Sequence, residues 1–418
     1  MKAIKCLFIL LAVTVGCGAA EKPPANEKKD TDAIMKGSNK FALELYAKLR
    51  TNEGNLFFSP YSISTALAMT YAGARGETES QMADVLHFAP LPDNVECSQN
   101  KEQFHSAFGA IIKDLNSRGA KGSFQLTVAN ALWGQKGYGF VPEFLQLVKD
   151  NYGGGLNEVD FVTAAEDARN TINAWVEKET KGKIKELIGQ GVLNQLTRLV
   201  LTNAIYFKGN WASRFEKDRT TDEPFTLPGG RKINAAMMNQ TAEFNYAESD
   251  SFQSLELPYV DNELSMIILL PKKADGLAGL EEELTQDNLS QWLEKLHKCK
   301  VIVSVPKFKQ TSQFSLAAVL QAMGLTDAFS PDKADFSGMN GKKDLFISAV
   351  VHKAYIEVNE EGTEAAAATG VVMGLTSVGP GSIKIPVFRA DHPFLFLIHD
   401  NLSGSILFIG RVTKPART

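Results

Sequence analysis

A long stretch without charge near the C-terminus most limits what this chain can fold into. Nineteen consecutive residues, 365–383, carry no charged side chain, although Glu357, Glu360, Glu361 and Glu364 lie just before them. The run AAAATGVVMGLTSVGPGSI is too long and too apolar for an ordinary surface loop. Its four glycines and its proline disfavour a continuous helix or a membrane span. A permanently buried strand and a loop that later enters a sheet both fit this composition.

The two-residue period of a β-strand gives this stretch two different faces. Glu364 is the single charge, and it falls on the face that could stay in water when the other face is buried. The buried face would be made of small and medium side chains. Its residues are Thr363, Ala365, Ala367, Thr369, Val371 and Met373. A sheet that receives this strand therefore needs to accommodate little side-chain volume.

The rest of the sequence has the composition and pattern of one mixed domain. Of 418 residues, 44% are hydrophobic and 22% are charged, which is ordinary globular composition. The net charge of −4 gives no global reason to expect nucleic acid as a partner. Strand-like segments such as LTVANALWG (126–134) alternate irregularly with helical ones such as PEFLQLVKDNY (142–152). We predict an α+β fold with largely antiparallel sheets, in a single domain over residues 37–418.

The N-terminal residues are typical of an exported protein. Two lysines precede an apolar run over residues 6–15, and small residues follow it, which is the layout of a signal peptide. We predict a signal peptide over residues 1–20 and a location outside the cytoplasm. The charged, proline-containing sequence that follows cannot bury a core. We therefore predict a flexible tether over residues 21–36.

Two processing sites compete at the end of the signal peptide. Cleavage after Ala20 would give a secreted protein. Cleavage before Cys17, in the sequence Thr14-Val15-Gly16-Cys17, would follow the pattern of a bacterial lipoprotein signal. Cys17 would then be lipidated and would anchor the protein to a membrane. In both cases the domain lies beyond the tether.

The sequence contains none of the common catalytic or metal-binding motifs. It has no GxSxG, no HExxH, no complete phosphate-binding loop and no dinucleotide-binding glycine pattern. The six histidines form no metal-like pair, and the four cysteines lack zinc-site spacing. Ser59 is followed by Pro60, so a helix cap or a buried hydrogen bond explains it better than a nucleophile does. We expect no enzymatic activity, no metal and no cofactor.

Five segments resemble, in order, the motifs of the serpin family of protease inhibitors. VNEEGTEAAAAT (358–369) is similar to the hinge of the reactive-centre loop in the inhibitory members. The other four segments are 57–82, 201–211, 305–308 and 390–412. The resemblance covers residues 37–418 and implies a single serpin domain with three β-sheets, eight or nine helices, and a loop exposed above a five-stranded sheet A. Together with the leader, it indicates a secreted or lipid-anchored bacterial serpin.

The resemblance implies a suicide mechanism. A serine protease attacks a bait bond in the loop and becomes an acyl-enzyme, and the hinge then inserts into sheet A before water releases the protease. Small residues after the hinge glycine favour rapid insertion. The implied hinge residues are Glu360, Gly362, Thr363, Glu364, Ala365, Ala366, Ala367, Ala368 and Thr369. The expected partner is a serine protease in a covalent complex with a monomeric inhibitor.

The family's residue count also implies a bait bond. Counting seventeen residues from Glu360 places it between Thr376 and Ser377, with Leu375 as an alternative bait residue. No lysine or arginine lies within 365–383, so we expect an elastase-, subtilisin- or chymotrypsin-like target. Two alternatives remain. The chain could be a non-inhibitory serpin that acts as a binding or chaperone protein, or a serine hydrolase that uses Ser59 or Ser377.

The resemblance assigns roles to several residues outside the loop. Trp211 matches an aromatic residue at the top of sheet A, where insertion begins. Lys307 and Glu360 match an ion pair that joins the hinge to a neighbouring strand. A hydrogen-bonding cluster beneath the centre of sheet A, called the shutter, is matched by Ser59, Ser62, Asn203 and His352. On the residues alone, ordinary core packing and satisfied buried polar groups would explain the same positions.

Overall fold

The computed structural model describes residues 25–88, 97–122, 124–363 and 385–415. Several residues singled out by the sequence lie outside these ranges. They are the predicted signal peptide with Cys17, the hinge residues from Glu364 to Thr369, and Leu375, Thr376 and Ser377 of the bait region.

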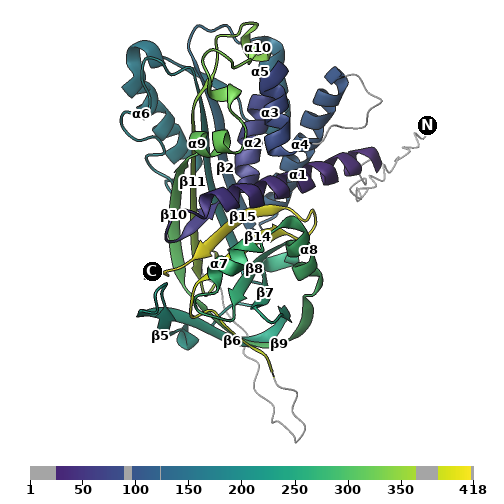
Figure 1. Ribbon diagram of the computed structural model, residues 1–418, viewed down its shortest axis with the longest axis vertical. Coiled ribbons are helices and arrows are strands. Elements are labelled where there is room, and N and C mark those ends of the chain that lie inside the picture. Colours follow the sequence, from purple (N-terminus) through teal and green to yellow (C-terminus); the bar gives the residue numbers. More distant parts are fainter. Residues whose placement is uncertain (1–24, 89–96, 123, 364–384, 416–418) are drawn as a thin grey trace, which may run out of the picture.

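A six-stranded sheet, which we call sheet A, runs along the long axis of the molecule (Figure 1). β4 and β11 lie beside each other in parallel from Leu199 and Ile347 to Tyr206 and Tyr355. β12 enters between them at one end only. In spatial order the strands are β10 (Phe308–Ser315), β11 (Ile347–Asn359), β12 (Gly362–Thr363), β4 (Leu199–Asn210), β2 (Phe124–Gln135) and β3 (Leu156–Val159).

A second sheet of nine strands fills the other part of the molecule. Its neighbours pair in antiparallel fashion except β13 and β9, which are parallel. The strand β8 has the apolar sequence LSMIILLP, and all of its residues are buried in this sheet. In spatial order the strands are β1 (Leu56–Phe58), β15 (Ile406–Val412), β14 (Phe394–Asp400), β8 (Leu264–Pro271), β7 (Phe252–Pro258), β6 (Lys232–Glu248), β9 (His297–Pro306) and β13 (Val387–Arg389), with β5 (Thr221–Thr226) paired to β6.

Helices cover both faces of sheet A. α6 (Phe161–Glu179) lies on one face, where Ile172 and Val176 are buried against strands β2, β4 and β11. The larger core lies on the other face. The remaining α-helices are α1 (Ala25–Leu49), α2 (Pro60–Tyr71), α3 (Gly76–Leu86), α4 (Cys97–Ala120), α5 (Pro142–Tyr152), α7 (Leu277–Glu282), α8 (Gln286–Glu294), α9 (Ala317–Ala322) and α10 (Ser337–Asn340), and short 3-10 helices span Lys217–Arg219, Val260–Asn262 and Asp327–Phe329.

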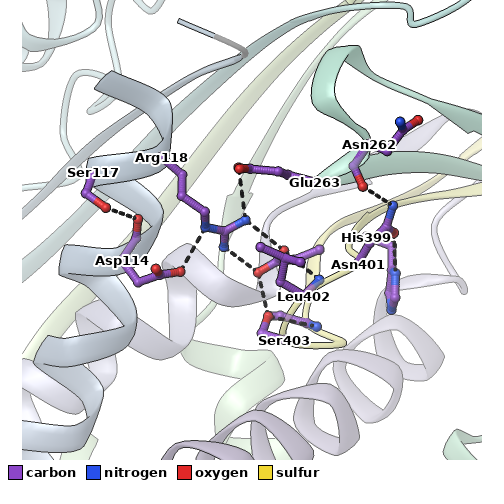
Figure 2. A network of polar contacts seen from close by, with 11 residues as sticks. Asp114, Ser117, Arg118, Asn262, Glu263, His399, Asn401, Leu402 and Ser403 are labelled. Carbon is purple, nitrogen blue, oxygen red and sulfur yellow. Dashed lines mark hydrogen bonds and ion pairs between the residues drawn. The ribbon is translucent and has the colours of Figure 1, made fainter. Parts of the chain in front are cut away.

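A buried ion pair ties α4 to the second sheet. The Arg118 guanidinium donates to both carboxylate oxygens of Asp400, at 3.0 and 2.7 Å. Figure 2 shows Arg118 between Asp114, to which its Nε donates, and the turn that carries Leu402 and Ser403. Arg118 is 4% exposed and Asp400 is fully buried. The Asp400 carboxylate also accepts from the backbone of Leu402 and the hydroxyl of Ser403. This network fixes the last turn of α4 against the turn between β14 and β15.

The α+β fold class is confirmed, while the expected counts differ in detail. The described residues contain ten α-helices where eight or nine were expected, and the strands form two continuous sheets where three were expected. Sheet A has six strands because the short β12 is already part of it. The expectation of three sheets came from the family resemblance, whereas continuous strand pairing here joins nine strands into one sheet beside the six of sheet A.

The predicted tether over residues 21–36 is wrong from residue 25 onward. α1 begins at Ala25, and Ile34 and Met35 are buried at 3% and 4% exposure. These residues lie two turns before Phe41 and Ala42 and continue the same buried stripe of the helix. Charged residues between this stripe and the leader concealed it in the sequence, and one of them, Asp30, is itself buried and accepts a hydrogen bond from Gln103 at 2.5 Å.

Candidate functional site

The first residues of the hinge already form a strand of sheet A. Gly362 lies opposite Asn359 on β11 and Asn210 on β4, and Thr363 follows in the same register. A Cβ atom at Gly362 would lie 2.0 Å from the carbonyl oxygen of Gly209. Glycine is therefore required here for β12 to approach β4.

Thr363 is the first residue of the predicted inward face, and it is fully buried. Its hydroxyl lies 2.8 Å from the phenol oxygen of Tyr259. Burial raises the pKa of Tyr259, so the phenol keeps its proton near neutral pH. The ring of Tyr259 stacks on Trp211 with centroids 4.7 Å apart. Trp211 thus positions the Tyr259 ring, and Tyr259 in turn contacts Thr363 where β12 enters the sheet.

Glu360 is buried and ion-paired at the turn between β11 and β12. Its carboxylate lies 3.1 Å from the ammonium of Lys307 and accepts a hydrogen bond from the hydroxyl of Thr220 at 2.8 Å. Burial opposes ionisation, but hydrogen bonds from its own backbone N–H, Thr220 and Lys307 lower the pKa of Glu360 below its ordinary value. The carboxylate is therefore charged near neutral pH and fixes the turn.

A buried polar cluster lies at the middle of the seam between β4 and β11. The amide nitrogen of Asn203 donates to the carbonyl and hydroxyl oxygens of Ser62, at 2.5 and 2.7 Å, and to Asn130. The backbone N–H of Ser62 donates to the hydroxyl of Ser59 at 3.1 Å. Asn203 also accepts from Nδ1 of His352. The structure thus brings together the four predicted shutter residues and adds Asn130.

The hydrogen bonds of His352 define its protonation state. Its Nε2 accepts from the backbone N–H of Ser59 at 3.2 Å, so the proton lies on Nδ1 and is donated to Asn203. Burial lowers the pKa of His352 to about 3. The ring is therefore neutral under physiological conditions. Any strand that enters the sheet here must replace the contact between His352 and Asn203.

Comparison with known proteins decides the family. The family model described as "Serpin (serine protease inhibitor)" matches residues 36–415. The chain is a serpin. Human leukocyte elastase inhibitor is 45% identical to it over 394 residues, which cover 92% of this chain and 100% of the relative. The leukocyte elastase inhibitor of Xenopus tropicalis is 44% identical and covers 90% of this chain and 97% of the relative.

Solved serpin structures share the whole fold. Uncleaved ovalbumin superposes with a TM-score of 0.82 at 33% identity, covering 92% of this serpin and 100% of ovalbumin. Serpin48 of the insect Tenebrio molitor has a TM-score of 0.79 at 34% identity and covers 92% of this serpin and 98% of its own chain. Human and frog relatives give no support to the bacterial source predicted from the leader.

The geometry of Ser59 argues against a hydrolase that uses this residue. Its hydroxyl is fully buried and donates to the carbonyl of Leu407 at 2.7 Å. His352 contacts the backbone N–H of Ser59 and not its hydroxyl, so this histidine is not placed to activate the hydroxyl. Ser59 instead caps α2 of the serpin by accepting from Ser62. Protease-inhibitor relatives likewise identify the serpin as a non-enzyme.

In the described part of the serpin, no three histidine, cysteine or acidic residues are grouped to hold a metal ion. None of its helices has the length and apolar character needed to cross a membrane.

Sequence reasoning missed three contributors to the site. Asn130 is a polar residue in the middle of the apolar strand β2, which was a usable signal for a buried hydrogen bond. Tyr259 and Thr220 gave no such signal. They reach the hinge through contacts 104 and 140 residues apart in the chain, and no local pattern encodes such contacts.

Proposed function

We propose that this serpin inhibits elastase-like serine proteases as a monomeric suicide substrate. The observation that carries the proposal is β12: the hinge residues Gly362 and Thr363 already lie between β4 and β11, with Thr363 buried. The relatives named leukocyte elastase inhibitor, at 42–45% identity, support the protease class. The uncharged stretch 365–383 supports it as well, because it offers no basic side chain to a trypsin-like pocket.

The chemical step is an acyl transfer that stops halfway. The catalytic serine of the protease attacks the bait carbonyl, which we place at Thr376 with Leu375 as the alternative. An ester bond forms between that serine and the bait residue, and the peptide bond to Ser377 breaks. The catalytic histidine of the protease gives its proton to the leaving amine. The hinge is then released at its far end while the protease stays attached to it.

The register of β12 predicts where each hinge residue goes on insertion. Thr363 pairs with Val358 and with Gly209, and each further residue pairs one step along both strands. Thr369 then falls between His352 and Asn203, which are themselves paired in the parallel register of β4 and β11. Its hydroxyl can replace the hydrogen bond that these two residues lose when the strands separate.

The insertion step is favourable on two physical grounds. One parallel pairing between β4 and β11 is exchanged for two antiparallel ladders, which gains backbone hydrogen bonds. Thr363 is already buried, and the five further inward side chains, from Ala365 to Met373, would contribute about 1 kcal/mol each on burial. Insertion that is faster than hydrolysis of the ester distorts and traps the protease.

The test is incubation of the purified full chain with pancreatic elastase. The proposal predicts a complex that survives boiling in SDS and a released fragment that begins at Ser377. Cleavage without a stable complex would show a non-inhibitory serpin. Hydrolysis of a peptide ester by the chain alone would show a hydrolase. A fragment with another first residue would move the bait bond and leave the mechanism intact.

We further propose that the serpin is exported and that a lipid on Cys17 anchors it. Support comes from the leader pattern and from the family match, which begins only at residue 36. Expression in a bacterial host with labelled palmitate tests this proposal. Label in the wild-type chain that is absent from Cys17→Ser supports anchoring. An unlabelled chain that begins at Glu21 would show plain secretion.

A further inference from the structure

Residues 211–220, which follow β4 and which we call the strap, contact the hairpin between β11 and β12. This hairpin spans residues 359–362. Backbone and indole N–H groups of the strap donate to three successive carbonyls of the hairpin, each at 2.9 Å. The pairs are Trp211 Nε1 with Asn359, Phe215 N with Glu360, and Trp211 N with Glu361. The hairpin is therefore fastened to the end of β4 as well as to β11.

The strap also binds the hairpin through a second ion pair. The ammonium of Lys217 lies 2.7 Å from Oε1 of Glu361. The Glu361 side chain is 13% exposed, whereas that of Lys217 is 70% exposed. The other carboxylate oxygen of Glu361 is buried and has no hydrogen-bond partner among the described residues. The hydrogen bond to Glu361 raises the pKa of Lys217, which keeps the ammonium charged.

We infer that Lys217 is a positioning residue for loop insertion. By binding Glu361, Lys217 fixes the position of the hairpin from which β12 extends. It therefore fixes the register of the inserted strand. A slip of two residues would keep the small side chains inward but would move Thr369 away from His352 and Asn203. Those buried groups would then lack a partner, and insertion would slow. This inference rests on the proposed function.

The effect of Lys217 should appear in the outcome of the reaction and not in the stability of the fold. An ion pair with one exposed partner contributes little to folding. Insertion, however, competes with hydrolysis of the same acyl-enzyme, so a small change in its barrier changes the ratio of trapped to released protease. A merely structural contact would change the melting temperature without changing this ratio.

The experiment compares Lys217→Met with the wild-type full chain against pancreatic elastase. We expect about two- to fivefold more inhibitor consumed per protease trapped, with an unchanged association rate. The matched control is Lys185→Met, because Lys185 is 67% exposed and pairs with Glu177 at 3.1 Å away from the hinge. The double variant Lys217→Glu with Glu361→Lys should restore trapping toward the wild-type ratio.

Hydrogen exchange of the β12 amides gives a readout that does not depend on inhibition. Lys217→Met should speed exchange at Gly362 and Thr363 by about two- to fivefold, and Lys185→Met should not. Unchanged exchange and unchanged stoichiometry, or equal changes in the control, would overturn the inference. A wild-type chain that traps no protease would refute the proposed function, and the exchange data would then decide the role of Lys217 alone.

Discussion

His352 on β11 and Asn203 on β4 lie directly opposite each other, and Nδ1 of His352 donates to Oδ1 of Asn203 across the seam of sheet A. Both residues are fully buried. The same amide of Asn203 binds Ser62 at the start of α2. This contact closes the two strands that must part for the hinge to enter, so the native state is held shut by side chains as well as by the backbone ladder.

Asn203→Ala should weaken the closed seam. The change leaves the buried Nδ1–H of His352 without its partner and removes two of the hydrogen bonds to Ser62, which keeps those to Asn130, so we expect a loss of about 1–3 kcal/mol in the free energy of unfolding. Guanidinium unfolding at pH 7.5 measures this loss. The exposed Asn170→Ala is the control and should change stability by less than about 0.5 kcal/mol. Equal effects of the two variants would contradict the role of the cluster.

Acidification should destabilise the native state through His352. Its pKa in the folded chain is about 3, below the value of about 6.5 in an unfolded chain. Between these values the unfolded state binds the proton and the folded state does not. The stabilisation is therefore complete above about pH 6.5 and falls by about 1.4 kcal/mol per pH unit as the pH drops toward 3.

The measurement for this prediction is the guanidinium midpoint between pH 5 and 7. Burial also lowers the pKa of His105 to about 3, with smaller effects of Lys101 and Arg75, so His105 and His352 both contribute to the slope in this direction, whereas the raised pKa of His392 opposes it. His352→Gln should remove one of the two contributions. The exposed His297→Gln should keep the wild-type slope. If His352→Gln leaves the dependence of stability on pH unchanged, then the ring of His352 can be protonated in the native state and the prediction is wrong.

Thr363→Arg should convert the inhibitor into a substrate. Thr363 is fully buried against Tyr259, and an arginine there would bury a charge without a partner. The arginine would keep β12 out of the sheet, so the rest of the hinge could not follow it, and we expect the SDS-stable complex to be lost while the loop is still cleaved. Thr363→Val, which keeps the shape, should still trap protease. Trapping by Thr363→Arg at the wild-type level would count against insertion at this seam.

Arg118→Met should destabilise the protein strongly. It removes the guanidinium of the network in Figure 2 and leaves the buried Asp400 carboxylate uncompensated, which costs about 3–5 kcal/mol in comparable buried pairs. Thermal unfolding measures the loss. Arg219→Met, which breaks an exposed pair with Glu216, should cost less than about 1 kcal/mol. A similar cost for both would show that the buried network does not stabilise the fold.

Local pattern predicted much of the fold, and long-range pairing explains what it missed. The strand-like segment LTVANALWG lies within β2, and the helical segment PEFLQLVKDNY forms α5, because the spacing of apolar residues suffices to specify such elements. The first turns of α1 were missed because lysines and acidic residues hide the buried stripe of Ile34 and Met35.

The site was harder to predict from the residues alone than the fold was. The period of two placed Thr363 on an inward face, where the structure also has it. The ion pair of Lys217 with Glu361 joins residues 144 positions apart, and neither residue is unusual in its own segment. Such a contact depends on how the strap folds back over the hinge, so it follows from topology and not from sequence spacing.

A crosslink that reports the register of the inserted strand tests the central claim most directly. The β12 register places Ala367 opposite Ala354 on β11 after insertion. In a background with Cys6, Cys17, Cys97 and Cys299 all replaced by serine, the pair Ala367→Cys with Ala354→Cys should form a disulfide only after the loop is cleaved, since cross-strand partners then come within bonding range. Moving the first cysteine to Ala365 should abolish the crosslink. A disulfide in the uncleaved chain, or none after cleavage, would contradict insertion between β4 and β11.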